Sequence, residues 1–179
     1  MVIKMTYIKK YNTPNGLSNI IMSSDDGIYL TGLWFENSKD QFKHSSDFKE
    51  KELPIFDETC KWLGIYFSNK NPSFKPKYKI ANLTPFRKMV IDIMNDIPYG
   101  KVITYNDIAK IIAKKKNIKK MSAQAVGGAV GFNPICIIIP CHRVVGNNYK
   151  LTGYSEGIEN KIELLRIEGN DIGKYKMPK

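Results

Sequence analysis

Short apolar runs separated by turn residues mark the first 53 residues of the chain. Residues 17–22 and 28–35 carry side chains typical of strands, and the dipeptides Asn15-Gly16 and Asp26-Gly27 beside them favour tight hairpin turns. Residues 36–53 are polar and charged, so we expect a surface loop there. The pattern therefore predicts a small N-terminal sheet.

The apolar positions change to helical spacing after this segment. From Pro54 to Phe67 they recur every three or four residues, which predicts a helix over 54–67 with one buried face. Residues 68–83 are rich in proline, lysine and asparagine, a composition typical of connectors. We therefore expect a domain boundary in this connector.

The second half of the chain predicts four more helices with one buried face each. They cover residues 84–97, 104–114, 122–130 and 158–168. Thr84 suits the N-cap of the first helix, and Gly169 suits the C-cap of the last. Residues 114–120 are a lysine-rich polar turn, so the order of helix, turn and helix matches a helix–turn–helix motif.

The helix predicted over 122–130 has unusual side chains for an element that reads bases in a DNA groove. They are small and apolar, with Gln124 as the long polar group. Gly127 and Gly128 cost about 1 kcal/mol each relative to alanine in a helix interior. Close approach of another backbone would offset this cost. That backbone could belong to a neighbouring helix or to nucleic acid in a narrow minor groove.

An apolar run of strand type, Ile137-Ile138-Ile139, leads into Pro140-Cys141-His142-Arg143. Cys141 is a candidate nucleophile, but a thiol with an ordinary pKa near about 8.5 needs a base to be reactive at neutral pH. Adjacent side chains on a strand point to opposite faces, so a bridging water or a turn would have to link His142 to the thiol. Glu168 is a candidate to orient the imidazole. Alone, such a pair is more often an inert buried thiol, and Cys136 and Cys60 suit core packing.

These elements predict an α+β fold with two domains. Residues 1–80 would form a small domain of sheet plus helix. Residues 81–179 would form a mainly helical domain that contains the helix–turn–helix and a short strand carrying Cys141. We find no internal repeat.

The charge and the cysteine content limit which partners and which kinds of site the chain can have. The chain has 28 Lys and Arg against 17 Asp and Glu, a net charge of +11, which favours nucleic acid as partner, although lysine-rich enzymes are also common. Three cysteines and two histidines, His44 and His142, argue against a disulfide framework and a structural metal, and we expect no cofactor. We recognise no secretion signal or membrane span. A cytoplasmic monomer, associated with the nucleoid when bound to DNA, is the expectation.

Pro140-Cys141-His142-Arg143-Val144 resembles the active-site signature of the methylated-DNA–protein-cysteine methyltransferases, the O6-alkylguanine-DNA alkyltransferases. Other segments resemble this family in the same order along the chain: 97–100 with 104–105, 125–129, 133–134, 153–155 and 164–169. The resemblance is specific over about residues 84–170 and weaker in the N-terminal part, where 29–34 matches best. It implies a ribonuclease-H-like structural domain in the first 80 residues and a DNA-binding, catalytic domain in the remainder.

The resemblance implies that Cys141 takes an alkyl group from O6 of guanine, or from O4 of thymine, in double-stranded DNA and is spent after one event. His142 would act through a water as the base, with Glu168 orienting it, and Arg143 would pair with a carboxylate. The target base would be flipped out through the minor groove, because O6 is unreachable while the base is stacked.

By the same resemblance, the residues that contact the base or the DNA come from several segments. They are Tyr105, Gln124, Ala125, Gly127, Asn133, Val144, Tyr154 and Ser155. Tyr105 would rotate the nucleotide by crowding its phosphate, and Tyr154 would wall the pocket. The backbone N–H of Ser155 would hold O6, the Val144 carbonyl would accept from the exocyclic amine, and Asn133 would fix the recognition helix against the active-site strand.

Two residues depart from the family pattern. Many relatives carry arginine where this chain has Gln124, the residue that would fill the gap left by the flipped base. Glu156 stands where a small residue is usual, and a carboxylate at the pocket mouth would crowd bulky adducts and favour methyl over benzyl groups. The alternative is that Glu156 turns out to solvent.

Three other functions are open from the residues. A non-catalytic protein that binds alkylated DNA would lack the cysteine, which is present here. A transcription factor would need base-reading side chains on 122–130. A Cys-His hydrolase would turn over ester or amide substrates, whereas an alkyltransferase reacts once.

Overall fold

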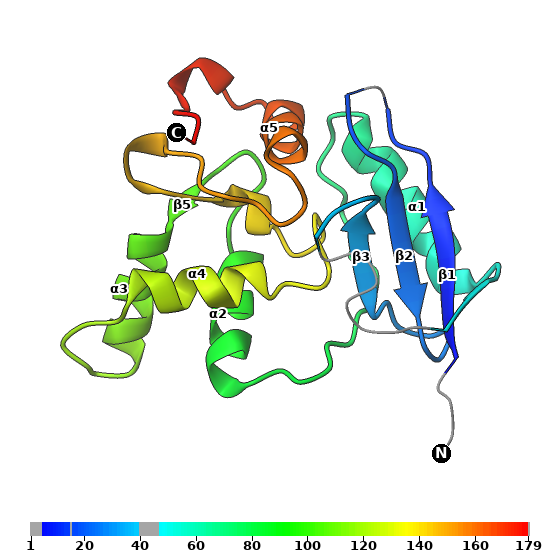
Figure 1. Cartoon of the computed structure of the whole chain (residues 1–179), viewed down its shortest axis with the longest axis horizontal. Helices are drawn as coiled ribbons and strands as arrows, with labels where there is room; N and C mark the ends of the chain where they lie inside the picture. The colour runs from blue at the N-terminus through cyan, green and yellow to red at the C-terminus, as the bar shows by residue number, and fades with distance from the viewer. Residues whose placement is uncertain (1–4, 15, 40–46, 179) are drawn as a thin grey trace. The chain divides into compact units, whose positions relative to one another are not determined.

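A computed structural model describes residues 5–14, 16–39 and 47–178 of the chain. The chain divides into two units, one comprising residues 1–81 with 134–138, and the other residues 82–133 with 139–179 (Figure 1). The fold is α+β, as the sequence predicts. Among the described residues, no helix is long and apolar enough to cross a membrane.

The first unit contains a four-stranded sheet of β1 (Thr6–Tyr11), β2 (Ile20–Ser24), β3 (Gly32–Phe35) and β4 (Phe48–Glu50). The strand order is β3-β2-β1-β4. β2 pairs antiparallel with both β1 and β3, and β4 pairs parallel with β1. The predicted turn at Asp26-Gly27 joins β2 to β3, and the Asp26 carboxylate accepts hydrogen bonds from the Ile28 and Tyr29 N–H groups. Asn15 of the other predicted turn lies outside the described residues.

Two predictions for this sheet are wrong in detail. Ile28 and Tyr29 belong to the turn, and the strand begins only at Gly32. β4 lies within the segment predicted to be a loop, because an edge strand is held by backbone hydrogen bonds and its side chains can stay polar and exposed. The spacing of apolar residues therefore gave no signal for it.

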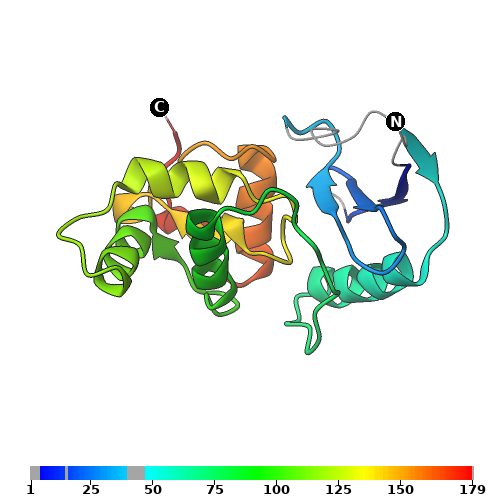
Figure 2. The ribbon, with the colours of Figure 1, turned by 90° about the horizontal axis from the view of Figure 1, so that it is seen from below.

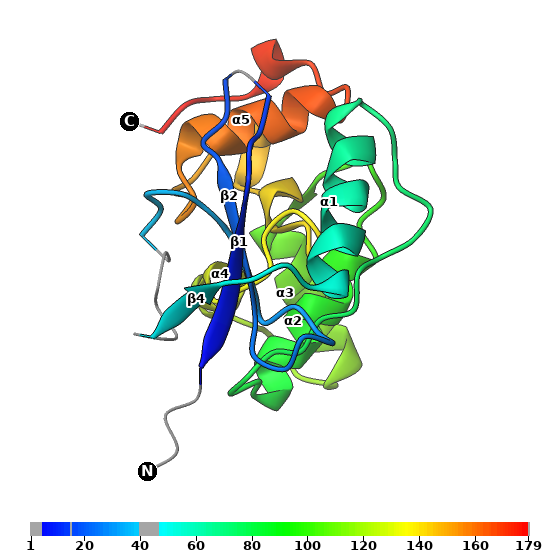
Figure 3. The same cartoon turned by 90° about the vertical axis from the view of Figure 1, so that its right-hand side faces the viewer.

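The helix predicted over 54–67 is present as α1 (Pro54–Phe67), and it covers one face of this sheet (Figures 2 and 3). Its buried side chains include Phe56, Trp62 and Tyr66. A Cβ at Gly32 would lie 2.0 Å from the Trp34 ring, so only glycine allows that ring to fold over the neighbouring strand position. Cys60 is only half-buried, whereas Cys136 is fully buried as expected for a core residue.

The second unit contains four α-helices and several short elements. The helices are α2 (Pro85–Asn95), α3 (Tyr105–Lys115), α4 (Ala123–Gly131) and α5 (Ile158–Ile167). The short elements are the parallel pair β5 (Ile103–Thr104) and β6 (Val144–Val145) and the 3-10 helices η1 (Cys141–Arg143), η2 (Asn147–Tyr149) and η3 (Ile172–Lys174).

Local capping fixes the starts of three of these helices. The Thr84, Thr104 and Ser122 side chains accept hydrogen bonds from the backbone N–H groups of Arg87, Asp107 and Ala125, respectively. α2, α3 and α4 pack against one another, and α3 and α4 lie side by side (Figure 2). The predicted helix–turn–helix is thus confirmed to within one residue at each helix boundary.

The predicted active-site strand is wrong. Residues 136–140 form tight turns instead, with Ile137 at φ +67°, and Cys141 is the first residue of η1. The Cys136 N–H still bonds to the Leu33 carbonyl of β3, but the N–H groups of Ile138 and Cys141 bond to carbonyls two residues earlier, so the backbone after Cys136 turns away from the sheet. The isoleucines are apolar because they are buried, not because they pair.

Candidate active site

The Cys141 thiol is almost fully buried, at 5% exposure. Its Sγ lies 3.5 Å from the Tyr154 hydroxyl, and the Asn133 side chain also bonds to it. Burial raises the pKa of this thiol above its ordinary value, although the bonds from Tyr154 and Asn133 act in the opposite direction. Asn133 also donates to the Ile139 carbonyl at 2.9 Å, which ties the end of α4 to the turn before Cys141. The resting cysteine is therefore a protonated thiol that needs a base.

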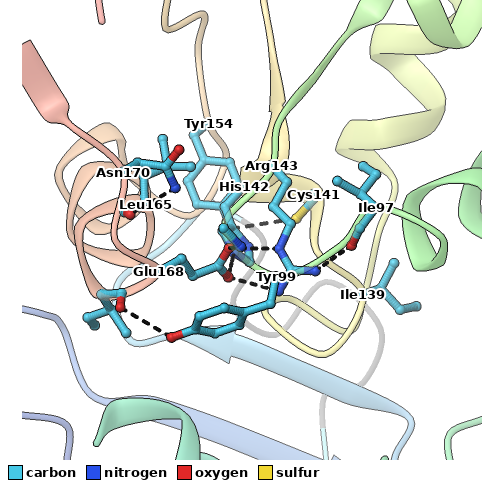
Figure 4. Close-up of polar contacts among 12 residues, drawn as sticks. Ile97, Tyr99, Ile139, Cys141, His142, Arg143, Tyr154, Leu165, Glu168 and Asn170 are labelled. Carbon is cyan, nitrogen blue, oxygen red and sulfur yellow. Dashed lines mark hydrogen bonds and ion pairs between the residues drawn. The ribbon is translucent and has the colours of Figure 1, made fainter. Parts of the chain in front are cut away.

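His142 and Arg143 converge on one buried carboxylate, Glu168 (Figure 4). His142 Nε2 lies 2.7 Å from Glu168 Oε1, as the predicted pairing of these residues requires. Arg143 donates to both carboxylate oxygens, from Nε at 2.8 Å and from Nη2 at 2.9 Å. Such a bidentate pair fixes both distance and plane, so the orientation of Glu168 is set from two sides. The carboxylate partner that the sequence left unspecified for Arg143 is Glu168.

The segment between α2 and β5 fixes the ends of this network. Arg143 Nη1 donates to the Ile97 carbonyl at 2.7 Å, and the Gly100 N–H donates to Glu168 Oε2 at 3.0 Å. Gly100 has φ +75°, and a Cβ there would lie 2.8 Å from the Glu168 carbonyl oxygen. The Tyr99 hydroxyl donates to the Ile167 carbonyl at the end of α5. Sequence reasoning assigned no role in the site to Ile97, Tyr99 or Gly100, although residues 97–100 are among the segments that resemble the family.

The charges in this network assign the proton of His142. Burial opposes charge on Glu168, but its contacts with His142 and Arg143 outweigh burial and hold the pKa of this carboxyl well below 4.5. Burial lowers the pKa of His142 below 6.5, although Glu168 acts in the opposite direction. The imidazole is therefore neutral at pH 7. An ionised carboxylate only accepts hydrogen bonds, so the imidazole proton is on Nε2 and the lone pair on Nδ1.

Lys161 is a member of the site that sequence reasoning missed. Its side chain is fully buried, and Nζ donates to the Val144 carbonyl at 2.7 Å. The same ammonium lies 5.4 Å from the centre of the Tyr154 ring. A signal was present, because Lys161 follows Ile158 by three residues and so falls on the predicted inward stripe of α5.

Glu156 does not turn out to solvent. It is 4% exposed, and its charge raises the pKa of Cys141. Asn160 donates to its backbone carbonyl at 2.7 Å, which holds the loop before α5. The neighbouring Ser155 is half-buried. The alternative in which Glu156 is a solvated side chain is therefore wrong.

The candidate DNA-contacting residues of α4 are exposed or partly exposed. Gln124 and Ala125 are exposed. A Cβ at Gly127 would meet only the Tyr105 ring, at 3.9 Å, and one at Gly128 would meet no atom of the described residues within 4 Å. A neighbouring helix is therefore not the reason for the two glycines in the part of the chain that the structure describes.

Tyr105 is half-buried at the start of α3, and its hydroxyl accepts a hydrogen bond from Thr152 at 3.2 Å. Its position beside Gly127 places it between the outer face of α4 and the loop that carries Tyr154. No group of three or more metal-ligating side chains occurs in residues 5–14, 16–39 and 47–178.

Comparisons with known proteins identify similar sequences and structures. A family model described as the DNA-binding domain of 6-O-methylguanine DNA methyltransferase matches residues 85–170. The chain is 40% identical over 150 residues to a methylated-DNA–protein-cysteine methyltransferase of Methanosarcina acetivorans, covering 84% of this chain and 92% of that protein. It is similar to a crystal structure of Mycobacterium tuberculosis O6-methylguanine methyltransferase, with a TM-score of 0.72, 29% identity and coverage of 92% and 93%. The Mycobacterium tuberculosis OGT structure in complex with DNA gives a TM-score of 0.69 and 28% identity, covering 96% of this chain and 94% of that one.

Proposed function

This chain belongs to the methylated-DNA–protein-cysteine methyltransferase family, and on that premise we propose that Cys141 takes an alkyl group from O6 of guanine in double-stranded DNA. Family membership makes the protein a methyltransferase that repairs DNA by alkyl transfer. O4 of thymine is a second position from which the same thiol would take a methyl group. The observation that carries this proposal is the buried thiol of Cys141 next to a neutral histidine held by Glu168.

The reaction is a displacement at the alkyl carbon. Cys141 Sγ forms the new carbon–sulfur bond while the bond from the alkyl carbon to O6 breaks. The thiol proton passes through a water to Nδ1 of His142 and ends on the guanine, so atoms and charge balance. The thioether is not reversed, and each chain reacts once. The His142–Glu168 distance of 2.7 Å supports this assignment, because it leaves Nδ1 as the basic nitrogen.

The pocket would recognise the flipped base with backbone groups. The Ser155 N–H would donate to O6, and the Val144 carbonyl would accept from the exocyclic amine, leaving the Tyr154 ring as one wall. The 3.5 Å separation of the Tyr154 hydroxyl from Cys141 Sγ supports the wall assignment. A base reaches such a buried thiol only after leaving the stack, so base flipping is part of the proposal.

The helix–turn–helix of α3 and α4 would bind the minor groove through its small side chains. The open surface at Gly128 supports this reading, since no described part of the chain occupies it. The net charge of +11 supplies affinity for phosphates of any sequence. Tyr105 would rotate the nucleotide, and Gln124 would fill the vacated space in the stack. Repair of damage at any position in DNA requires this lack of sequence preference.

The buried carboxylate of Glu156 supports a preference for small adducts. We expect the ratio of methyl to benzyl transfer to fall in Glu156→Gly, because that variant removes bulk and negative charge beside the thiol. The rates for both adducts would be measured with each protein under single-turnover conditions. An unchanged ratio would remove Glu156 from the account of adduct preference.

The finer steps are tested with modified duplexes. Duplexes with O6-methylguanine or O4-methylthymine would be mixed with the protein, and transfer to Cys141 would be followed by peptide mapping. A 2-aminopurine placed next to the lesion would report unstacking by its fluorescence. Transfer from both duplexes with a fluorescence rise is expected, and transfer without a rise would contradict base flipping. Cys141→Ala should bind and unstack the base without transfer, which separates recognition from chemistry.

A further inference from the structure

The ammonium of Lys161 lies next to two groups of the proposed base-binding pocket, the Val144 carbonyl and the Tyr154 ring. It donates to the Val144 carbonyl at 2.7 Å and lies 5.4 Å from the centre of the Tyr154 ring. The hydroxyl of that ring is in turn 3.5 Å from Cys141 Sγ. Lys161 therefore contacts two of the groups proposed to hold the base, and it comes from α5 rather than from the active-site turn.

Burying a charged ammonium group away from water costs free energy of folding. Burial lowers the pKa of Lys161 from 10.5 to about 8, so the group is still mostly protonated at pH 7. A methionine of similar length would fill the same volume without desolvating a charge, and replacing buried ions by apolar groups is often neutral or stabilising. Packing alone therefore does not account for the charge of Lys161.

The charges around the thiol indicate what the ammonium does. The groups that act on Cys141 come from several elements: Tyr105 of α3, Asn133 after α4, Tyr154 and Glu156 of the following loop, and Lys161 of α5. His142, Arg143 and Glu168 act on one another, and Lys161 also lowers the pKa of His142. After burial and the hydrogen bonds, the charges that act on the thiol are Glu156, which raises its pKa, and Lys161, which lowers it. Arg143 is engaged by Glu168 in a bidentate pair.

We propose that Lys161 is a positioning residue of the transfer reaction. Its ammonium balances the charge of the Cys141 thiolate and holds the Val144 carbonyl and the Tyr154 ring at the base-binding pocket. This inference rests on the proposed function. The effect of Lys161 on the Cys141 thiolate, however, involves only the protein and can be measured without DNA. Loss of the thiol proton to His142 creates a negative charge in a buried site, and a fixed cation nearby stabilises that state.

The test compares Lys161→Met, Lys161→Arg and Lys61→Met. Lys61 is an exposed residue of α1 in the other unit, so its variant matches the change in net charge. The rate of Cys141 alkylation by iodoacetamide would be measured from pH 6 to 10 without DNA, and methyl transfer with saturating O6-methylguanine duplex. Circular dichroism and thermal unfolding would accompany both.

The expected result for Lys161→Met is a folded protein whose alkylation midpoint moves up by about one pH unit, with alkylation near pH 7 about tenfold slower. Lys161→Arg should restore the midpoint at least in part, and Lys61→Met should match the wild type. An unchanged midpoint in folded Lys161→Met would overturn the proposal. A midpoint shift without any methyl transfer in the wild type would retain the charge effect and refute the proposed function instead.

A second measurement uses the unsubstituted chain, in case Lys161→Met does not fold. The pKa of Lys161 would be followed by NMR of its ε-carbon before and after iodoacetamide alkylates Cys141. Coupling is reciprocal, so removing the titrating thiol should lower the pKa of Lys161. The same pKa in both forms would show that the two groups do not interact, and would reject the proposal.

Discussion

Replacing Gly128 with alanine should stabilise the unbound protein and weaken its binding to DNA. Gly128 lies inside α4, and a Cβ there would meet no described atom within 4 Å, so the substitution introduces no internal clash. Alanine is favoured over glycine in a helix interior by about 1 kcal/mol. For a chain of this length, that gain corresponds to a rise in Tm of roughly 2–4 °C.

The effect on DNA should have the opposite sign. If the small face of α4 approaches the floor of the minor groove, the new methyl group occupies space that the nucleic acid needs. Overpacking by one methyl group costs about 1–3 kcal/mol, which corresponds to a roughly 5- to 150-fold loss of affinity. The expected loss is the same for unmodified duplexes of different sequence, because the face carries no base-reading group.

Gly64→Ala is the matched control. Gly64 is an exposed glycine inside α1, and its Cβ would meet only the Tyr11 hydroxyl, at 4.0 Å. Urea unfolding and fluorescence-anisotropy titration of duplex DNA would be measured for both variants. Both should gain stability, and only Gly128→Ala should lose affinity. Unchanged DNA affinity in Gly128→Ala would refute the idea that α4 lies against DNA, and lost stability would refute the assignment of open space at this position.

Three further predictions concern the carboxylate network and the DNA-facing helix. Since the pKa of Glu168 is held below 4.5, the carboxylate stabilises the fold at neutral pH and loses this effect on acidification. The difference in unfolding free energy between the wild type and Glu168→Gln should therefore shrink below about pH 4.5. Thermal unfolding from pH 3 to 7 measures this difference, and a constant value would contradict the prediction. Gly100→Ala should lower both stability and transfer rate, because φ at Gly100 is +75° and the new Cβ would lie 2.8 Å from the Glu168 carbonyl oxygen. Unfolding and single-turnover assays that match the wild type would contradict a role for Gly100 in holding Glu168. The slope of log affinity against log salt should be smaller by about 1 for the wild type than for Gln124→Arg, because arginine adds one positive charge; equal slopes would show that position 124 does not lie against the DNA.

The sequence was sufficient for the helices of the second unit. Thr84-Pro85 and the spacing of apolar residues predict the start of α2, and the helix–turn–helix differs from prediction by one residue. These signals are local, so a single sequence carries them. The run of isoleucines before Cys141 was misjudged because a short apolar run is equally compatible with a paired strand and a buried turn.

The remaining parts of the site depend on contacts between distant segments. Gly100 and Glu168 are 68 residues apart in the chain, and nothing near either residue announces their hydrogen bond. Lys161 had a local signal, as a charge on an apolar helix stripe, but its partner Val144 could be identified only in three dimensions. Likewise, the burial of Glu156 follows from how its loop folds and not from the residue type.

Intact-mass spectrometry of the protein after mixing with duplex DNA containing O6-methylguanine tests the central claim most directly. Cys141→Ala would serve as the control. The account predicts a gain of one methyl group, at most one per chain, that is absent in the variant. No gain in mass together with tight binding to the same duplex would contradict the account and leave a protein that binds damaged DNA without repairing it.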